Sequence, residues 1–420
     1  MSFRGVLVKS EIPGFYKLGL AERLAVVKKM ADLNPQEVRE LMNSGALDLD
    51  IADIMIENVV GVTHIPLGIA VNFKVNGKDY LVPMATEEPS VIAAASHAAK
   101  LALPGGFKAE SDEPIMIGQV QLVGVKDFDK LKDAVLSKKD EIIKACNGKD
   151  SVIVGLGGGV KNIEVRRLDT QRGTMAIVHL LVDVRDAMGA NSVNTMCETI
   201  SPFLEEITGA KARLHIISNL AMHRKSRATA VWRKEDLGED AIEGILDAYH
   251  FALNDPYRCA TNNKGIMNGI DAVFLATGND FRAAEAGAHA YAALDGYKPL
   301  ARYERDARGN LVGTIEMPLP AGIIGGSIRT NPIARIALKI LGVKSARELS
   351  EVAACAGLAN NFAALRAMVR EGIQRGHMKL HAKNIAIMAG AKGSDIYEVT
   401  DRMIQESNIS VSRAMELLKL

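Results

Sequence analysis

Hydrophobic and polar positions alternate with different periods in different segments of the chain. Apolar residues at helical spacing in residues 20–41, interrupted by Pro35, predict two consecutive helices. From Gly68 to Met84, apolar and polar residues alternate around Asn76-Gly77, a dipeptide that favours a type I′ turn, so this segment is predicted to be a β-hairpin. A helix with proline in its first turn is expected from Pro89 to Leu101.

The middle of the chain has a pattern of its own. Its short β-branched runs and longer amphipathic stretches predict the order β-α-β-β-α-β, which is typical of a ferredoxin-like sandwich. We expect this unit to be inserted, over residues 114–220, between two parts of a larger domain. The predicted strands are 116–125, 163–168, 175–184 and 212–217, with a further strand-like pair at Ile153-Val154, and the predicted helices are 128–146 and 191–207.

The segments after this unit are predicted to be mostly helical. The pattern indicates a helix at 241–253, a polar turn, a strand at Ala272–Thr277, a helix at 281–294 and further helices after Pro332. From Gly376 onwards, two or three short helices could form a mobile C-terminal piece. Alternation of Ala-rich helices with β-branched strands, together with 37 glycines, indicates an α/β or α+β enzyme with many tight turns.

Composition and charge exclude several classes of protein. The 420 residues include 51 Lys and Arg against 50 Asp and Glu, so no excess of positive charge points to a nucleic-acid partner. The four cysteines are scattered without a C-x-x-C pair, which fits a reducing compartment. Charged residues interrupt the N-terminal segment, and the apolar stretch 91–103 is too short to span a bilayer, so we expect a cytoplasmic protein without a membrane partner.

Two acidic residues precede the helix expected at 89–101. Glu87 and Glu88 stand in the sequence Glu-Glu-Pro-Ser, which ends at Ser90. Because adjacent carboxylates repel each other, a buried member of the pair could keep its proton and act as an acid. The alternative is that both residues only complement the positive end of the helix dipole.

A lysine surrounded by amides and glycines is a second candidate. Residues 262–269 read Asn-Asn-Lys-Gly-Ile-Met-Asn-Gly, and the strand expected after them ends at Gly278-Asn279-Asp280. Lys264 could neutralise an oxyanion if Asp280 lies beside it. The alternative is a pair of ordinary turns with a surface lysine.

Two further segments carry candidate chemistry. His377 and His381 share a helical face but lack a third ligand, so we expect a proton donor here and no metal. The strand expected at 175–184 leads through small residues, 186–191, into a helix whose N-terminus could hold a pyrophosphate. Neither this segment nor the glycine-rich 155–159 matches the G-x-G-x-x-G fingerprint, so both could be ordinary loops.

Several of these segments occur together in one known order. The blocks are Glu57-Asn58-Val59-Val60-Gly61, Glu87-Glu88-Pro89-Ser90, Asp186-Ala187-Met188-Gly189-Ala190-Asn191, Asn263-Lys264-Gly265, Gly278-Asn279-Asp280 and Gly376-His377-Met378. In this order they resemble the 3-hydroxy-3-methylglutaryl-CoA (HMG-CoA) reductases, most closely the class II enzymes of bacteria and archaea. The resemblance extends from about Ala46 to Ala391, and several blocks in register are far more specific than any single motif.

The resemblance implies an α+β fold with three parts. A large mixed substrate-binding and dimerisation domain would comprise residues 1–113 and 221–373, an inserted ferredoxin-like dinucleotide-binding domain residues 114–220, and a C-terminal helical flap residues 374–420. The implied catalytic residues are Glu88, Lys264, Asp280 and His377. The implied substrate contacts are Ser90, Asn219, Arg258 and Asn268, and the implied cofactor contacts are Asp150, Asp186, Ala187, Met188, Gly189, Ala190 and Asn191.

The implied activity is the two-step, four-electron interconversion of HMG-CoA with mevalonate and CoA, using two NAD(P)H. Asp150 favours NADH over NADPH as cofactor, because a carboxylate accepts hydrogen bonds from a 2′-hydroxyl and repels a 2′-phosphate. A homodimer or larger homo-oligomer is expected, because sites of this family lie at dimer interfaces. The chain departs from the family pattern at Asn262 and Asn360, where histidine and glutamine are usual.

Three questions stay open at this level. The same site could synthesise mevalonate or degrade it. Another nicotinamide-dependent acyl-CoA or aldehyde oxidoreductase is an alternative, and it would use a different thioester. A non-catalytic CoA-binding regulator is the other alternative, although such a protein would have no reason to keep an acid, a cation and a proton donor together.

Overall fold

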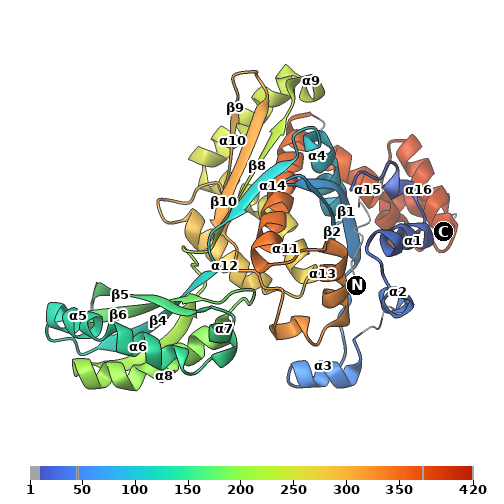
Figure 1. Cartoon of the computed structure of the whole chain (residues 1–420). Helices are drawn as coiled ribbons and strands as arrows, with labels where there is room; N and C mark the ends of the chain where they lie inside the picture. The colour runs from blue at the N-terminus through green and yellow to red at the C-terminus, as the bar shows by residue number, and fades with distance from the viewer. Residues whose placement is uncertain (1–9, 44, 46, 371–372, 419–420) are drawn as a thin grey trace.

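The computed structural model describes residues 10–43, 45, 47–370 and 373–418, with the side chains of 151, 327 and 373–380 left out of the description. Two sheets organise this part of the chain, as Figure 1 shows. The larger sheet has six strands in the order β2-β1-β3-β8-β10-β9. These strands are β1 (Leu67–Val75), β2 (Lys78–Ala85), β3 (Phe107–Ser111), β8 (Lys225–Trp232), β9 (Ala301–Arg305) and β10 (Leu311–Pro318).

The hairpin predicted around Asn76-Gly77 is confirmed as β1 and β2, which pair antiparallel with Val75 opposite Lys78. Both turn residues have positive φ angles, 51° for Asn76 and 84° for Gly77, as a type I′ turn requires. Strands β3, β8, β9 and β10 were not predicted. Strand β8 pairs with β3 and β10, which are far away in the sequence, and no local turn signal indicates such pairing. Strands β9 and β10 form a local hairpin that the sequence analysis missed.

Long helices pack against the larger sheet and bury most of the hydrophobic core. The central helix α14 contributes Phe362, whose ring stacks on that of Trp232 with centroids 3.8 Å apart. By length and composition α14 could cross a membrane, but 67% of the apolar window is buried inside the protein, as in a core helix. The helices of this part are α4 (Val91–Ala102), α9 (Lys234–Leu237), α10 (Glu239–Asn254), α11 (Pro256–Ala276), α12 (Phe281–Ala292), α13 (Pro332–Leu341) and α14 (Ala346–Arg370).

One prediction in this region is wrong. Residues 256–276 form a single helix, α11, where the sequence indicated a polar turn and a strand at Ala272–Thr277. Asp255 caps this helix through its side chain and Pro256 occupies its first turn, both of which are helix-start signals. The asparagines and glycines that suggested a loop have low helix propensity, but buried contacts override that preference.

The smaller sheet has four antiparallel strands in the order β5-β6-β4-β7. Its strands and major helices follow the predicted β-α-β-β-α-β order, with the first predicted helix divided into α5 and α6. Ile153-Val154 was wrongly predicted to be strand-like, and it lies in the short helix α7, which Asp150 caps. The elements are β4 (Ile115–Val123), α5 (Phe128–Ser137), α6 (Lys139–Asn147), α7 (Ser151–Gly155), β5 (Gly159–Thr170), β6 (Gly173–Asp183), α8 (Ala190–Thr208) and β7 (Lys211–Ser218).

The two ends of the chain add helices at one side of the larger sheet (Figure 1). The C-terminal helices have a small core of their own, which includes Ala382, Val399 and Met403. The N-terminal elements are η1 (Phe15–Lys17), α1 (Leu20–Met30), α2 (Pro35–Met42) and α3 (Leu49–Met55), of which α1 and α2 confirm the two helices predicted at 20–41. The C-terminal elements are α15 (Ile373–Met388), α16 (Asp395–Gln405) and α17 (Val411–Leu417). The short η2 (Gly326–Ile328) lies earlier in the chain, between β10 and α13.

Candidate active site

Glu88 lies in the tight connection between β2 and α4. Its backbone N–H donates to the hydroxyl of Thr86 at 3.2 Å, which fixes the turn. Ser90, at the N-cap of α4, has a φ angle of 85°, a backbone conformation that residues other than glycine rarely adopt. Strained backbone of this kind gathers at functional sites, where the surrounding structure holds it in place.

Lys264 projects from α11 toward this turn. Its Nζ lies 2.9 Å from Glu88 Oε2, and 60% of the lysine side chain and 33% of the glutamate side chain are exposed. Asn268 is one helical turn further along α11, and its Nδ2 lies 3.5 Å from the same glutamate oxygen. The structure therefore brings a cation, a carboxylate and an amide together at the surface.

Buried amides anchor the helix that carries Lys264. Asn263 is fully buried, donates to the carbonyl of Lys298 at 3.0 Å and accepts from the N–H of Leu300 at 3.1 Å. Asn262 accepts a hydrogen bond from Asn361 of α14 at 3.0 Å. The two asparagines preceding Lys264 thus hold the helix from its buried side, so the lysine emerges from a rigid base.

Close packing between α11 and α14 completes that base. A Cβ placed on Gly269 would lie 2.5 Å from the carbonyl oxygen of Ala356, so glycine is needed there. Asn360 is buried in the same contact, and its Nδ2 donates to the carbonyl of Ala356 at 3.3 Å.

Two cavities meet at the Glu88 turn. A cavity of about 240 Å³ is lined by Glu88, Ser90, Gly265, Asn268 and Asn360, among others. A larger one of about 1520 Å³ shares Glu88 and Ser90 and extends between α1, β1 and α4. Its lining includes three cationic side chains, those of Arg23, Lys28 and Lys100.

Other candidate residues lie apart from this cluster. Asp280 caps α12, accepting from the N–H groups of Arg282 and Ala283, and its carboxylate pairs with Arg282 at 3.2 Å. Its contacts within the described chain do not include Lys264. Arg258 lies in the first turn of α11 with its guanidinium 3.8 Å from the sulfur of Met368, and burial lowers its pKa.

The last two substrate and catalytic candidates are Asn219 and His377. Asn219 lies on the connection from β7 to β8, where its carbonyl packs against Gly287 of α12. His377 belongs to α15, but its side chain lies outside the described residues.

The segment 186–191, which we call the dinucleotide loop, links β6 to α8. Gly189 has a φ angle of 98°, and a Cβ there would lie 2.4 Å from Val184, so only glycine fits. The helix begins directly afterwards at Ala190, with Asn191 exposed in its first turn. A helix N-terminus with small residues and free N–H groups suits a phosphate, so the loop fits the expected dinucleotide.

Two carboxylates among the expected cofactor contacts have structural partners. Asp186 accepts the N–H of Ala346, at the start of α14, at 2.8 Å. Asp150 accepts the N–H of Ile153 at 3.0 Å through one oxygen, which caps α7.

The sequence analysis did not single out Arg224 or Asn279. Arg224 bonds the dinucleotide loop, and Asn279 bonds Gly322, which packs against that loop. Asn279 stood in a recognised block, whereas nothing near Arg224 in the sequence indicated a role.

These features define an oxidoreductase-like arrangement, with a lysine–glutamate pair beside a cavity and a separate α+β unit whose loop fits a dinucleotide. Comparison with known proteins gives the family. Residues 19–382 match the hydroxymethylglutaryl-coenzyme A reductase family. The chain therefore belongs to that family.

Individual relatives agree with this assignment. The 3-hydroxy-3-methylglutaryl-coenzyme A reductase of Archaeoglobus fulgidus is 57% identical over 414 residues, 98% of this chain and 95% of the relative. A probable enzyme of the same name from Borreliella burgdorferi is 35% identical over 83% of this chain and 80% of its own length. The 3-hydroxy-3-methylglutaryl-coenzyme A reductase of Streptococcus pneumoniae has a similar solved structure, with a TM-score of 0.83 and 40% identity over 97% of this chain and 99% of the other.

Another structure of the class II enzyme from S. pneumoniae is described as bound to NADPH in open conformations. It matches with a TM-score of 0.81 and 40% identity over 96% of this chain and 99% of the other. The predicted family and activity are thus confirmed: the chain is an HMG-CoA reductase, an NAD(P)H-dependent oxidoreductase of the mevalonate pathway.

Proposed function

We propose that Glu88, Lys264, Asp280 and His377 carry out the reduction, with Ser90, Asn219, Arg258 and Asn268 holding the hydroxymethylglutaryl group. The observation that supports this most directly is the 2.9 Å pair between Lys264 and Glu88 beside the two cavities. When bound, the nicotinamide supplies hydride to a carbonyl carbon. Lys264 then stabilises the negative charge that develops on the carbonyl oxygen, which requires a cation already in place.

The proposal also assigns the two proton donors. Glu88, in contact with Lys264 and Asn268, is placed to deliver a proton when the aldehyde carbonyl is reduced. Departure of the CoA thiolate also needs a proton, and an imidazolium with a reference pKa of about 6.5 can protonate a thiolate whose thiol has a pKa of about 8.5. We assign this step to His377. Its position in the terminal segment lets closure of that segment exclude water.

The large cavity is the proposed site for the CoA part of the substrate. It begins at the Glu88 turn and runs along α1 and α4, and Arg23, Lys28 and Lys100 line it. Cationic side chains of this kind suit the phosphates of CoA, because ammonium and guanidinium groups pair with phosphate oxygens. A substrate lying in this cavity would present its thioester at Lys264.

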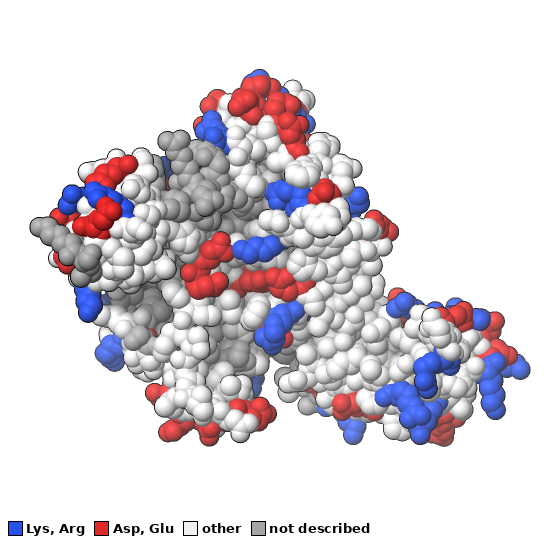
Figure 2. Space-filling view, turned by 180° about the vertical axis from the view of Figure 1, so that it is seen from behind, with Lys and Arg blue, Asp and Glu red and all other residues white. Residues whose placement is uncertain are grey.

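The three-part domain division is proposed on the same basis. Residues 114–220 would form the dinucleotide domain, residues 1–113 and 221–373 the substrate domain, and residues 374–420 the flap. The separate four-stranded sheet and the separate C-terminal core support this division. Figure 2 shows Lys and Arg side chains interspersed with Asp and Glu on the four-stranded unit, at the lower right.

NADH is the proposed preferred cofactor. Asp150 lies between α6 and α7, and its cap bond fixes the carboxylate while leaving acceptor capacity for a ribose hydroxyl. The NADPH bound to the S. pneumoniae enzyme belongs to that relative, so the preference of this chain depends on its own residues. The test is a spectrophotometric assay with HMG-CoA and each cofactor. A higher kcat/KM with NADH supports the assignment, and a higher value with NADPH contradicts it.

A homodimer or larger homo-oligomer is the proposed assembly. Five large apolar side chains between residues 49 and 65 are at least 44% exposed, which is typical of a surface that another chain covers. Figure 2 also shows a broad area without charged side chains beside the four-stranded unit. The exposed apolar residues are Leu49, Ile54, Ile56, Val60 and Ile65.

A cytoplasmic location is proposed from the cysteines. Cys146, Cys197, Cys259 and Cys355 are all free and buried, and burial raises the pKa of each thiol. Such thiols behave as small apolar core residues, and a reducing compartment preserves them in that state.

A further inference from the structure

Arg224 lies beneath the dinucleotide loop with only 4% of its surface exposed. Its guanidinium donates to the carbonyls of Ala187 and Met188, both at 3.2 Å, and to the carbonyl of Ala321 at 2.5 Å. Burial lowers the pKa of Arg224 to about 10, although the nearby carboxylates of Asp183 and Asp186 oppose this. A buried cation is costly to leave unpaired, so these three carbonyls must stay in place around it.

Asn279 holds the same region from the opposite side. Its side-chain oxygen accepts the N–H of Gly322 at 2.7 Å, and its Nδ2 donates to the carbonyl of Gly322 at 3.1 Å. One amide side chain thus satisfies both backbone groups of one residue. Asn279 directly precedes Asp280, the proposed catalytic residue that caps α12.

Residues 321–324 lie between these two side chains and touch the dinucleotide loop directly. The N–H of Ile323 donates to the carbonyl of Asp186 at 2.9 Å, and Ile324 forms a parallel bridge with Ala187. A Cβ on Gly322 would lie 2.7 Å from the backbone nitrogen of Met188, so no side chain fits between them. We call Arg224, Asn279 and residues 321–324 the clasp.

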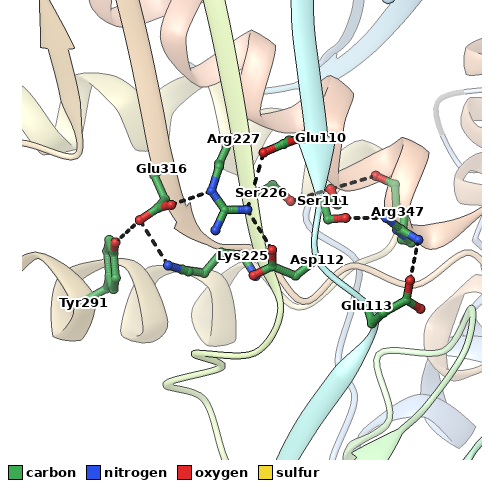
Figure 3. A network of polar contacts seen from close by, with 10 residues as sticks. All are labelled: Glu110, Ser111, Asp112, Glu113, Lys225, Ser226, Arg227, Tyr291, Glu316 and Arg347. Carbon is green, nitrogen blue, oxygen red and sulfur yellow. Dashed lines mark hydrogen bonds and ion pairs between the residues drawn. The ribbon is translucent and has the colours of Figure 1, made fainter.

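The surrounding connections between the two sheets are braced by ion pairs, shown in Figure 3. Arg227 of β8 bonds Asp112 at 2.7 Å and Glu316 at 2.5 Å, and Lys225 bonds Glu316 at 3.1 Å. Arg347, beside the residue that Asp186 contacts, pairs with Glu113 at 2.9 Å. Arg227 and Lys225 thus hold the ends of β3, β8 and β10 together beside the clasp, through pairs that are less exposed than the pair of Arg347.

We propose that Arg224 and Asn279 are positioning residues that couple the dinucleotide loop to the turn carrying Asp280. Neither needs to touch the cofactor or the substrate. Asn279 fixes the 321–324 segment relative to Asp280, and Arg224 fixes the same segment relative to Ala187 and Met188. Loosening the 321–324 segment should therefore weaken dinucleotide binding, because this segment contacts the dinucleotide loop directly. The inference rests on the proposed dinucleotide site and the proposed role of Asp280.

The test compares dinucleotide and substrate affinities in four variants of the full chain. NADH dissociation constants are measured by fluorescence titration, and HMG-CoA binding by calorimetry. We expect Asn279→Ala to raise the NADH dissociation constant roughly 5- to 20-fold, with HMG-CoA affinity changed by less than about twofold. Arg224→Lys, which keeps the charge, should show a smaller loss of NADH affinity than Asn279→Ala. Asn279→Asp, which places a charged oxygen against the carbonyl of Gly322, should lose at least as much NADH affinity as Asn279→Ala.

Arg347→Gln is the matched control, because it removes an ion pair at the same seam without touching the clasp. Its NADH affinity should stay within about twofold of wild type, since surface ion pairs contribute little. Equal losses in Arg347→Gln and Asn279→Ala, equal losses of NADH and HMG-CoA affinity, or an unchanged NADH affinity in Asn279→Ala would each overturn the coupling.

A fifth variant separates the inference from the function on which it rests. Asn191→Asp places a negative charge at the exposed first turn of α8, and should weaken NADH binding directly if the dinucleotide lies there. An effect of Asn191→Asp without an effect of Asn279→Ala refutes the clasp alone. No effect of Asn191→Asp refutes the proposed dinucleotide site and the clasp with it.

Discussion

The two proposed sites are built differently. Lys264 and Glu88 would act on the substrate through side chains from two separate elements, whereas the dinucleotide loop would bind its ligand mainly through backbone groups. The first pair depends on charged tips that are 60% and 33% exposed above buried amides. The loop instead depends on Gly189, the start of α8 and a buried arginine that binds carbonyls. A site made of side chains should be lost by one substitution, while a site made of backbone should be weakened step by step.

Lys264→Ala should produce the largest effect. Removing the cation leaves the developing oxyanion without its partner, and we expect kcat to fall by roughly 10²- to 10³-fold while HMG-CoA still binds. Steady-state turnover and calorimetric binding check this. The matched control is Lys234→Ala, which breaks another lysine–glutamate pair, with Glu239 at 2.5 Å, and neither of these residues lines either cavity. Turnover near wild type in Lys264→Ala would refute the assignment.

His377→Gln should have the next largest effect, and only on one half of the reaction. Loss of the proton donor should slow reduction of the thioester by roughly 10²-fold, because the thiolate must leave unprotonated. Reduction of added mevaldehyde by the same variant has no thiolate to release, so it serves as the internal control. Equal losses with both substrates would contradict the role of His377.

Asp150→Asn should change cofactor choice more modestly, since it alters one contact of a site built mostly from backbone. Loss of the carboxylate charge should reduce the ratio of kcat/KM with NADH to kcat/KM with NADPH by roughly tenfold. Asparagine keeps the oxygen that caps α7, whereas Asp150→Ala removes both charge and cap. If only the alanine variant changes the ratio, the effect arises from the cap and the electrostatic explanation is wrong.

The smallest expected effect is on the pH dependence of stability, and it concerns Asp271 of α11. Burial and the neighbouring Glu285 raise the pKa of Asp271 to about 8, and Glu285 also raises the pKa of His289. At Asp271 the folded state therefore keeps a proton that the unfolded state has released between about pH 4 and 8, so the contribution of this group to stability should fall as pH rises through this range.

Asp271→Asn should flatten that dependence of the melting temperature, because it removes the largest of these shifts. Melting temperatures of wild type and variant between pH 5 and 9 check this. Parallel curves would show that Asp271 is not the group responsible. If turnover changes with pH in parallel with stability, the packing between α11 and α12 also affects Lys264, which α11 carries.

The sequence permitted prediction of what local signals encode. Asn76-Gly77 specifies a hairpin, and the strands and helices between residues 115 and 218 have clear periods. The identity of Lys264 and Glu88 as candidates also came from local motifs. Their 2.9 Å contact joins positions 176 residues apart, and no sequence pattern gives such a distance.

The remaining features depend on contacts that are distant in sequence. Asn263 is helical because Lys298 and Leu300 satisfy its buried amide, so local propensity alone predicted a loop. Strand β8 pairs with β3 and β10, more than a hundred and about eighty residues away, respectively. Arg224 could not be distinguished from a surface arginine, because only the folded chain gathers its three carbonyl partners.

The most direct test of the central claim is a double-mutant cycle on the catalytic pair. Values of kcat/KM are measured for wild type, Glu88→Gln, Lys264→Ala and the double variant, with HMG-CoA as substrate. If the two groups act as a unit, the double variant should be about as slow as the slower single variant. Losses that multiply independently would contradict the account, because they would show that Lys264 and Glu88 do not work together at one carbonyl.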